Sequence, residues 1–385
     1  MKHRTQFYGL TVALVLLAGL FAGCAPKSAT PVVTEAPVAA TAYPVATSAL
    51  TITDTLGRTV VFDKMPERIV VAGKATALMV NTLYLFPEAA TKLVAIENRS
   101  QSPDAFISVI DPGYADKLTL EKNAGPEAIA PAQPDVVILK SSVKEKLGDP
   151  LEAIGIKVVY LDLETPESFF KDLQTIGALF GNTERADEVT AYYQGKVSQV
   201  TEALKDLKAE DKIRVLMLQH SIEDNVTSFG VPPANWLQTI LIETAGAIPV
   251  WKDDVTGDGW QTVTVDQIAA WNPYGIAIID YDGGALEAIA AIQADPTWQA
   301  LEAVKENRLV AFPMDYLSWD QPDPRWILGL QWLAANMYPQ FFSDFDMQAE
   351  VTEFYQTLYG MDETAITTTV LPLLKGTLVI ERDVD

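Results

Sequence analysis

The stretch NTERADEVTAYYQGKVSQVTEALKDLKAED, residues 182–211, decides how the rest of the chain is organised. Its apolar residues recur at steps of three or four, the period of one face of an α-helix. The spacing predicts a helix of about 24 residues, about 36 Å long. Gly181 ends the preceding helical pattern, and Lys205 and Lys208 suit a helix C-terminus. Such a helix either spans two lobes or lies along one. Its apolar stripe consists of Ala186, Val189, Tyr193, Val197, Val200, Leu204 and Leu207.

Short, nearly continuous apolar runs lie on both sides of this helix and read as buried strands of parallel sheets. Runs of this style alternate with helical stretches, which predicts an α/β fold. Because 385 residues exceed one comfortable core, we expect two packing units. The first set of runs is RIVVAG (68–73), KLVAI (92–96), DVVIL (135–139) and IKVVYL (156–161), and the second is IRVLMLQ (213–219), GIAIID (275–280) and RLVAF (308–312).

The N-terminus has the layout of a secretory signal. A short basic start is followed by an apolar run over residues 10–20, which is too short for a stable membrane span. The stretch LFAGCAPKSATPVV, residues 20–33, is similar to a bacterial lipobox, in which the cysteine, here Cys24, becomes acylated. We therefore expect a signal peptide over 1–23, an Ala/Pro/Thr-rich tether over 24–50, and a lipid anchor at the outer face of the cell membrane. The alternative is an ordinary signal peptide with a chance cysteine.

Composition excludes several classes of function. Lys and Arg number 28 against 51 for Asp and Glu, a formal charge of -23, which argues against a nucleic-acid partner. The single cysteine rules out an internal disulfide and a cysteine-based metal cluster. No G-x-S-x-G, HExxH or P-loop motif is present, so we expect neither an enzyme nor a cofactor.

Six motifs in order resemble one family, the solute-binding proteins of ABC importers that take up iron-siderophore, haem, cobalamin and related metal complexes. The resemblance covers about residues 51–335. It implies two α/β lobes, each with a mainly parallel sheet flanked by helices, joined by one long helix. The motifs are ITDTLGRTVVFDKMPERIVVAG (52–73), EAIAPAQPDVVIL (127–139), LEAIGIKVVYLD (151–162), TIGALFGNTERADEVTAYY (175–193), TVDQIAAWNPYGIAII (264–279) and DPTWQALEAVKENRLVAFP (295–313).

The resemblance also implies boundaries and a partner. The N-terminal lobe is expected over 51–181, the bridging helix over 182–210 and the C-terminal lobe over 211–385, with the placement of 340–385 left open. In this family an exposed acid on each lobe meets basic residues of the permease. The matching positions are Glu127 and Asp266, although the family usually has Glu at the second. The alternative is that both are ordinary first-turn carboxylates stabilised by the helix dipole.

The ligand is expected between the lobes, in loops that follow the strands. Cations after three first-lobe strands favour an anionic or polar chelate, although each taken singly is also consistent with a solvated loop charge. The expected ligand-binding residues are Lys74, Arg99, Lys140, His220, Tyr281, Tyr316, Trp319 and Arg325.

The loop PMDYLSWDQPDPRW, residues 313–326, is the richest of these. Asp323 and Pro324 predict an N-cap and first helical residue, which would set Arg325 beside free backbone N–H groups. Tyr316 and Trp319 would stack on a planar ligand. The alternative makes the aromatic residues a hydrophobic lid and Arg325 a structural ion pair with an aspartate.

A single histidine and a segment similar to a calcium loop give weaker indications of a site. His220 is the only histidine after the signal region, so a metal site of several imidazoles is excluded, and it either touches ligand or caps a strand. The segment DVTGDG, residues 254–259, imitates a calcium loop, but Val265 stands where a bidentate acid is required, which predicts a turn instead.

The expected function is capture of a metal chelate, a ferric siderophore first, and its delivery to an ABC permease by a monomeric, lipid-anchored protein. Corrinoid, haem and a molybdate-type oxyanion are the alternative ligands. A lipid-anchored sensor or scaffold of the same fold is the alternative role.

Overall fold

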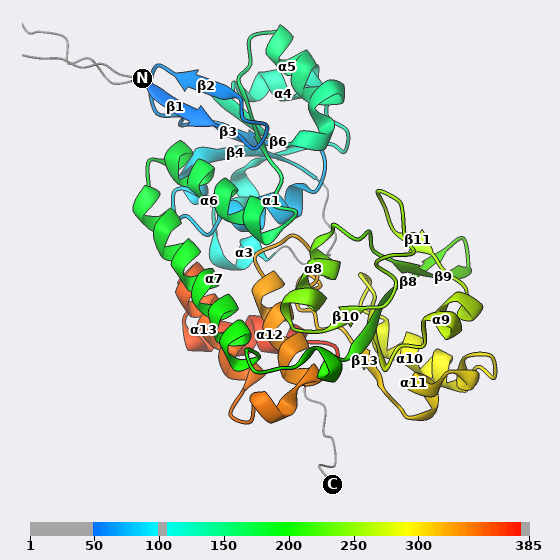
Figure 1. Cartoon of the computed structure of the whole chain (residues 1–385). Coiled ribbons are helices and arrows are strands. Elements are labelled where there is room, and N and C mark those ends of the chain that lie inside the picture. The colour runs from blue at the N-terminus through cyan, green and yellow to red at the C-terminus, as the bar shows by residue number, and fades with distance from the viewer. Residues whose placement is uncertain (1–48, 99–105, 379–385) are drawn as a thin grey trace, which may run out of the picture. The chain divides into compact units, whose positions relative to one another are not determined.

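Five of the strands that precede the long helix form one parallel sheet in the computed structural model, which describes residues 49–98 and 106–378 (Figure 1). Its order is β5-β4-β3-β6-β7, and every pairing is parallel. The four predicted runs are confirmed as strands, and short β5 was not predicted because two of its three residues are exposed. The strands are β3 (Ile69–Val71), β4 (Leu93–Glu97), β5 (Leu118–Leu120), β6 (Val136–Lys140) and β7 (Val158–Leu161).

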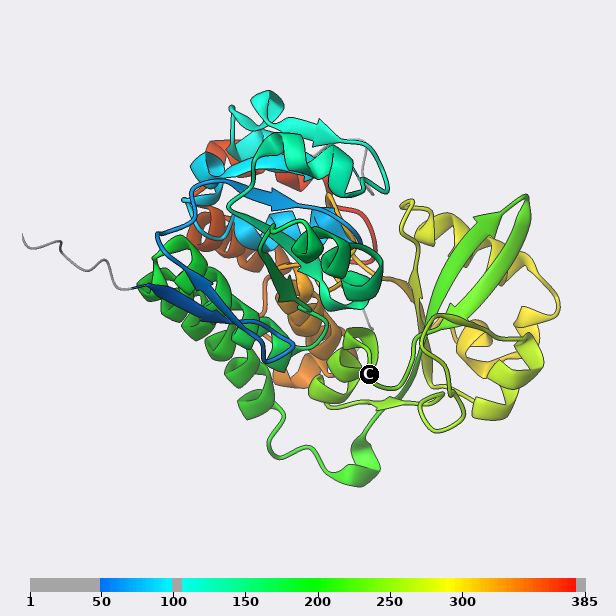
Figure 2. The same cartoon turned by 90° about the horizontal axis from the view of Figure 1, so that it is seen from above.

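The strands that follow the long helix form a mixed six-stranded sheet of order β11-β9-β8-β12-β13, with β10 paired to β8. β8 runs beyond its predicted end and turns back into antiparallel β9, which Figure 2 shows as two long arrows. The turn residues Asp224 and Asn225 both have positive φ, which these short polar side chains tolerate in a hairpin turn. The strands are β8 (Arg214–Glu223), β9 (Val226–Val231), β10 (Ile248–Pro249), β11 (Gln261–Thr262), β12 (Gly275–Ile279) and β13 (Leu309–Ala311).

Helices flank both sheets, and a separate hairpin of β1 (Leu50–Thr53) and β2 (Thr59–Phe62) precedes the first sheet. The hairpin turns at Asp54, whose carboxylate accepts the N–H groups of Leu56 and Arg58. The helices are α1 (Thr76–Leu83), α2 (Ala89–Lys92), α3 (Ile107–Ile110), α4 (Pro126–Ile129), α5 (Asp149–Ala153), α6 (Pro166–Phe180), α7 (Thr183–Ala203), α8 (Leu237–Thr244), α9 (Val265–Trp271), α10 (Ala285–Ala294), α11 (Glu302–Lys305), α12 (Trp326–Met337), α13 (Met347–Tyr359) and α14 (Glu363–Ala365).

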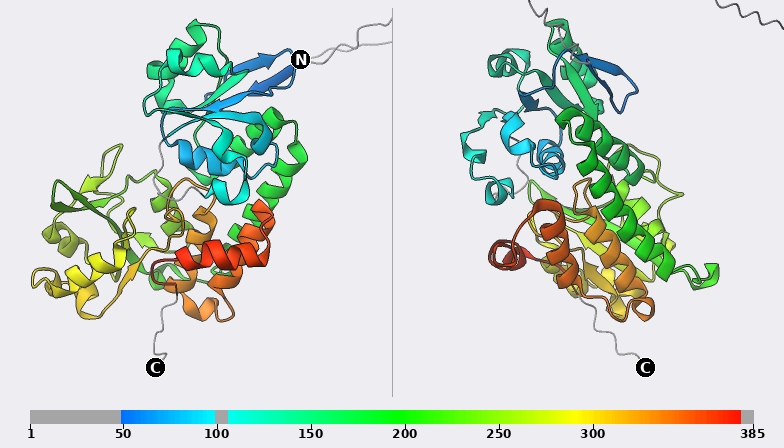
Figure 3. Two further views of the ribbon diagram at one scale, coloured as in Figure 1. Left: turned by 180° about the vertical axis from the view of Figure 1, so that it is seen from behind. Right: turned by 90° about the vertical axis from the view of Figure 1, so that its left-hand side faces the viewer.

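The predicted long helix is α7. It begins after Asn182, whose side chain accepts the N–H of Arg185 at 3.0 Å, and it has 21 residues rather than 24 because the chain turns at Leu204. The stripe is buried as predicted over Ala186, Val189, Tyr193 and Val200. α7 packs against α6 from the first half and α12 from the second, so one helix contacts both halves (Figure 3). The exact lobe boundaries stay a prediction.

The placement of the last part of the chain, left open by the sequence, has two components. Helix α13 lies against α7, where Arg185 Nη2 donates to the carbonyl of Leu358 at 2.8 Å, and it reaches the first half through Tyr359, which donates to the carbonyl of Asn81 at 3.1 Å. The chain then returns to the second sheet, where the N–H of Thr377 donates to the carbonyl of Ala311 at 2.9 Å. Residues 347–378 therefore contact both halves.

Within residues 49–98 and 106–378, no helix is both long and apolar enough to cross a membrane. The predicted signal peptide, Cys24, almost all of the tether and Arg99 lie outside the described residues.

The stripe of α7 contains one residue that the pattern did not predict. Lys196 is buried, and its Nζ lies 2.6 Å from Glu350 Oε2 and 3.0 Å from Glu353 Oε2 of α13. These two carboxylates stabilise the ammonium group where water does not reach it, and they join α13 to α7.

We predict that Lys196→Ala lowers the free energy of unfolding by about 2 kcal/mol, because it removes the buried cation shared by the partly buried Glu350 and the half-exposed Glu353. Chemical denaturation measures this change. Lys205→Ala is the control, since Lys205 also faces a glutamate but is exposed, and it should change stability by less than about 0.5 kcal/mol. Equal effects of the two substitutions would contradict the role given to the buried pair.

Candidate functional site

The carboxyl ends of the first sheet hold two of the predicted cations in different states. Lys74 follows β3, is exposed, and has no hydrogen-bond or ion-pair partner within the described residues. Lys140 ends β6 and is 2% exposed. Its Nζ donates to Glu164 Oε1 at 2.7 Å and to the carbonyl of Asp162. Lys74 is therefore available to a solute, whereas Lys140 holds the loop after β7.

That loop is further fixed by a buried carboxylate. Asp172 Oδ2, on α6, accepts the N–H groups of Asp162 at 2.7 Å and Leu163 at 2.9 Å, and Leu163 has a positive φ. Asp162 in turn accepts a hydrogen bond from Ser141, which follows β6. Burial raises the pKa of Asp172 to about 6, because its charged form is removed from water.

At the carboxyl ends of the second sheet, His220 and Asp280 form a pair. His220 Nδ1 lies 2.6 Å from Asp280 Oδ2, and Asp280 Oδ1 also accepts the N–H of Asp282 at 2.8 Å. The imidazole lies beside Phe229, with ring centroids 5.5 Å apart. Both partners are largely buried, so the pair links β8 to the loop after β12.

Tyr281 is anchored through its hydroxyl group. The hydroxyl donates to Asp320 Oδ2 at 2.9 Å, and the same carboxylate oxygen accepts from Gln238 Nε2 at 3.0 Å. Asp320 is fully buried, and burial raises the pKa of its carboxyl. The ring of Tyr281 is therefore held in a fixed orientation while one side of it stays partly exposed.

Two tryptophans that were not predicted as site residues lie next to this ring, one after the other. Trp260, before β11, lies 6.3 Å from Tyr281 between ring centroids, and Trp236, before α8, lies 5.9 Å from Trp260. All three side chains are partly exposed. We call Trp236, Trp260 and Tyr281 the aromatic row. The available signal was two tryptophans at the ends of irregular segments, in PPANW and GDGW, but only the fold brings them to Tyr281.

Tyr316, Trp319 and Arg325 lie together, but in the core. Arg325 and Trp319 are fully buried, and Tyr316 is 5% exposed. Arg325 Nε lies 2.6 Å from Asp315 Oδ1, and Arg325 Nη1 lies 2.7 Å from Asp323 Oδ1. These contacts are those of the alternative interpretation, a hydrophobic lid and a structural ion pair.

The predicted start of the following helix is wrong by two residues. α12 begins at Trp326 rather than at Pro324, and Arg325 precedes it. The reason is that Asp323 Oδ1 accepts from both the N–H and the guanidinium of Arg325, which keeps these residues in a turn. The guanidinium of Arg325 is therefore paired with Asp315 and Asp323. It is not available to bind an anion at the N-terminus of α12.

The two predicted docking acids occupy equivalent positions in equivalent elements. Glu127 is the second residue of α4 and Asp266 the second residue of α9, and both are exposed. Each lies eight residues before the residue that immediately precedes the next strand, Asp135 or Tyr274. Those two residues make the same bond, since their N–H groups donate to the carbonyls of Arg68 and Arg214, each at 2.8 Å.

The calcium-like segment adds no metal site. Within the described residues, no group of three or more His, Cys, Asp or Glu side chains is arranged to hold a metal ion. Asp254 instead accepts a hydrogen bond at 2.6 Å from the indole of Trp271, at the end of α9.

Comparisons with known proteins agree with this architecture. Residues 69–316 match a family model described as periplasmic binding protein. The molybdate-binding protein MolA of Haemophilus influenzae is 22% identical over 331 residues, 80% of this chain and 88% of MolA. Its structure with bound molybdate has a TM-score of 0.65 at 20% identity, covering 81% of this chain and 98% of MolA.

Two proteins of Bacillus subtilis are also similar. YvrC, an uncharacterized ABC transporter substrate-binding lipoprotein, is 23% identical over 348 residues, 89% of this chain and 100% of YvrC. An iron-uptake system-binding protein is 19% identical over 227 residues, 58% of this chain and 68% of that protein.

We predict that Asp172→Asn removes a gain in stability of about 2 kcal/mol that the unsubstituted protein shows as pH falls below about 6, because the amide does not take up a proton in this range. The folded-state pKa of Asp172 lies above its unfolded value. Its contribution to stability therefore grows as pH falls from about 6 towards 4 and is lost as pH rises. Thermal unfolding between pH 4 and 7 should show this gain only in the unsubstituted protein. Asp206→Asn, at an exposed carboxylate, should leave the profile unchanged.

Proposed function

Because the chain belongs to the periplasmic binding protein family, and is a solute-binding protein of the ABC-transporter type, we propose that it captures a metal chelate, a ferric siderophore first. The ligand lies at the carboxyl ends of the two sheets, and the protein delivers it to an ABC permease. The lipid anchor at Cys24 and the location at the outer face of the cell membrane belong to this proposal and rest on residues 1–33.

The aromatic row is the observation that supports this ligand class. Three rings in edge contact, one of them fixed by a buried carboxylate, offer flat apolar faces to the organic part of a chelate. Lys74 supplies a charge for an anionic complex. Siderophore, corrinoid and haem all have large organic frameworks that use such faces, and the iron-uptake relative supports the choice of iron.

A bare oxyanion is the second candidate, and the molybdate-binding relative favours it. An oxyanion is held by several convergent N–H or cationic donors. Here Lys140 is paired with Glu164, Arg325 is paired with two aspartates, and the hydroxyl of Tyr281 donates to Asp320. The described residues therefore support an organic chelate better than a tetrahedral anion.

We predict that Trp260→Ala weakens binding of the ligand at least about tenfold, because it removes the middle ring of the aromatic row. Titration of a ferric siderophore panel, cobalamin, haem and molybdate by intrinsic fluorescence identifies the ligand, and calorimetry then compares the variants. Trp319→Phe is the control, since Trp319 is buried, and it should bind within about twofold of the unsubstituted protein. Binding of molybdate alone, unaffected by Trp260→Ala, would favour the oxyanion candidate.

Delivery is proposed to use Glu127 and Asp266, on the evidence of their matched positions and exposure. We predict that Glu127→Ala with Asp266→Ala reduces stimulation of the transporter's ATPase at least about fivefold without changing ligand affinity, because exposed acids steer and register a charged partner. The assay uses the cognate permease in lipid nanodiscs.

The control for docking is Glu167→Ala, which removes an exposed first-turn acid of α6 and should have no effect. Asp266→Glu should keep full stimulation. If the double variant stimulates normally, the acids are ordinary first-turn carboxylates, and the sensor or scaffold role gains support.

A further inference from the structure

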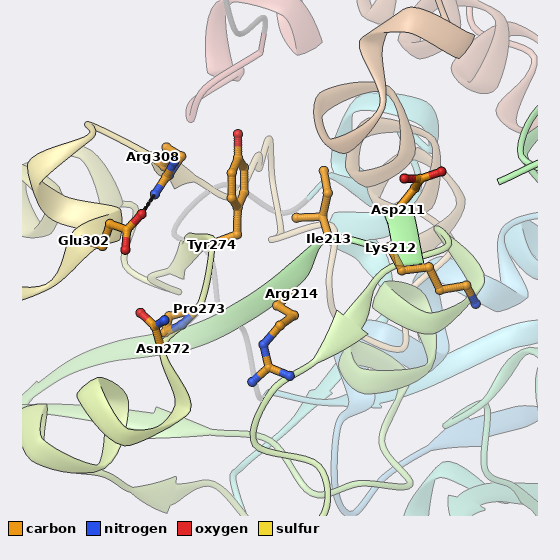
Figure 4. A pocket seen from close by; sticks show the side chains of 9 residues that line it. All are labelled: Asp211, Lys212, Ile213, Arg214, Asn272, Pro273, Tyr274, Glu302 and Arg308. Atoms are coloured by element: carbon orange, nitrogen blue, oxygen red, sulfur yellow. Dashed lines mark hydrogen bonds and ion pairs between the residues drawn. The ribbon is translucent and has the colours of Figure 1, made fainter. Parts of the chain in front are cut away.

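The second sheet carries a pocket at the edge opposite to the aromatic row. A cavity of about 350 Å³ lies where β8, β12 and β13 begin (Figure 4). We call it the amino-edge pocket. Arg214, which opens β8, and His220 are six residues apart on one strand, about 20 Å at 3.3 Å per residue. This pocket is therefore separate from the proposed ligand site.

Its lining concentrates positive charge on a strongly acidic protein. Lys212, Arg214 and Arg308 line the pocket against two acids, Asp211 and Glu302. Glu302 is paired with Arg308 at 3.3 Å, and Figure 4 shows this as the interaction among the side chains drawn. Arg214 and Lys212 have no carboxylate partner within the described residues.

Both arginines are held in place, Arg308 with Glu302 as its ion-pair partner and Arg214 by a backbone carbonyl alone. The guanidinium of Arg308 lies 4.1 Å from the ring centroid of Tyr274, and its Nε is buried with no partner in the described part of the chain. Arg214 Nη2 donates to the carbonyl of Trp271 at 2.8 Å. Both forks are thus fixed, which lowers the entropy lost when an anion binds.

The corresponding edge of the first sheet, where β3 begins, has a carboxylate that the edge of the second sheet lacks. At the equivalent place Arg68 donates to the carbonyl of Ala132, as Arg214 does to that of Trp271. There the next strand is preceded by Asp135, whose carboxylate accepts the N–H groups of Glu67 and Arg68. In the second sheet this position is Tyr274, which is 42% exposed and carries no charge. The start of β8 therefore lacks the neighbouring carboxylate that Asp135 places at the start of β3.

We propose that the amino-edge pocket binds a phosphate group that carries a small organic substituent. Arginine forks match phosphate oxygens, and the cavity is larger than a bare phosphate needs. The ring of Tyr274 and the side chain of Ile213 supply an apolar wall for the substituent. The phosphate comes either from a free monoester or from the diester headgroup of a membrane lipid.

The experiment titrates the full chain, purified in detergent at low salt, with two soluble probes. Glycerol 3-phosphate represents the free monoester, and glycerophosphoglycerol represents the lipid headgroup. We expect saturable heat of binding with at least one probe, and the probe that binds identifies the source. No saturable binding of either probe up to about 20 mM would overturn the proposal.

The matched variants are Tyr274→Asp and Tyr274→Asn, which have nearly the same shape and differ in charge. Both variants lose the ring that lines the pocket, so they are compared with each other. Tyr274→Asp adds a carboxylate and should bind at least about tenfold more weakly than Tyr274→Asn. Arg214→Gln with Arg308→Gln should also abolish binding, which provides a test should Tyr274→Asp fail to fold. Equal binding by all variants would place the anion elsewhere and overturn the proposal.

Discussion

The buried charge of Arg325 is the constraint on which the rest of the structure depends. A fully buried guanidinium is stable only with compensating charge, and Asp315 and Asp323 supply it. Asp323 also accepts from Asn81 Nδ2 of α1 at 2.6 Å, and Tyr355 of α13 donates to Asp315 at 2.7 Å. The same few charges therefore hold together the loop after β13, helix α13 and helix α1 of the first half of the chain. Phe106 covers the guanidinium at 4.6 Å and completes the cluster.

The two halves are variations on one construction. In each, an arginine lies at the start of the first strand of the sheet, a short helical segment is followed by a residue with positive φ, and a proline comes next before the following strand. Gln133 and Asn272 are those residues, with φ of 50° and 45°. The construction fixes the short helix relative to the sheet, so Glu127 and Asp266 are exposed in the same way on both halves. The two halves differ at the residue after each proline, which is Asp135 in the first and Tyr274 in the second, and only the first carries a charge there.

The sequence predicted the strands better than it predicted which charged side chains are buried. Strands such as Val136–Lys140 are nearly continuous apolar runs, and this composition predicts burial on both faces of the sheet. Lys140 and Arg325 looked like ligand-binding cations because they follow strands or precede a helix. Lys140 pairs with Glu164, 24 residues away, and Arg325 pairs with Asp315, ten residues away. The spacing of these residues in the sequence does not predict either ion pair. Trp236 and Trp260 were missed for the same reason, since their proximity to Tyr281 depends on three separate loops.

The sequence by itself determined the α/β class, the seven strands that are continuous apolar runs, and the long helix with Ala186, Val189, Tyr193 and Val200 on its buried face. These features follow from local periodicity, because each helix or strand shows its buried face in its own residues. Only the tertiary structure decided which charged and aromatic side chains are buried and paired in the core and which remain exposed. That outcome depends on contacts between residues far apart in the chain, and each burial or ion pair is fixed by a partner that no local pattern identifies.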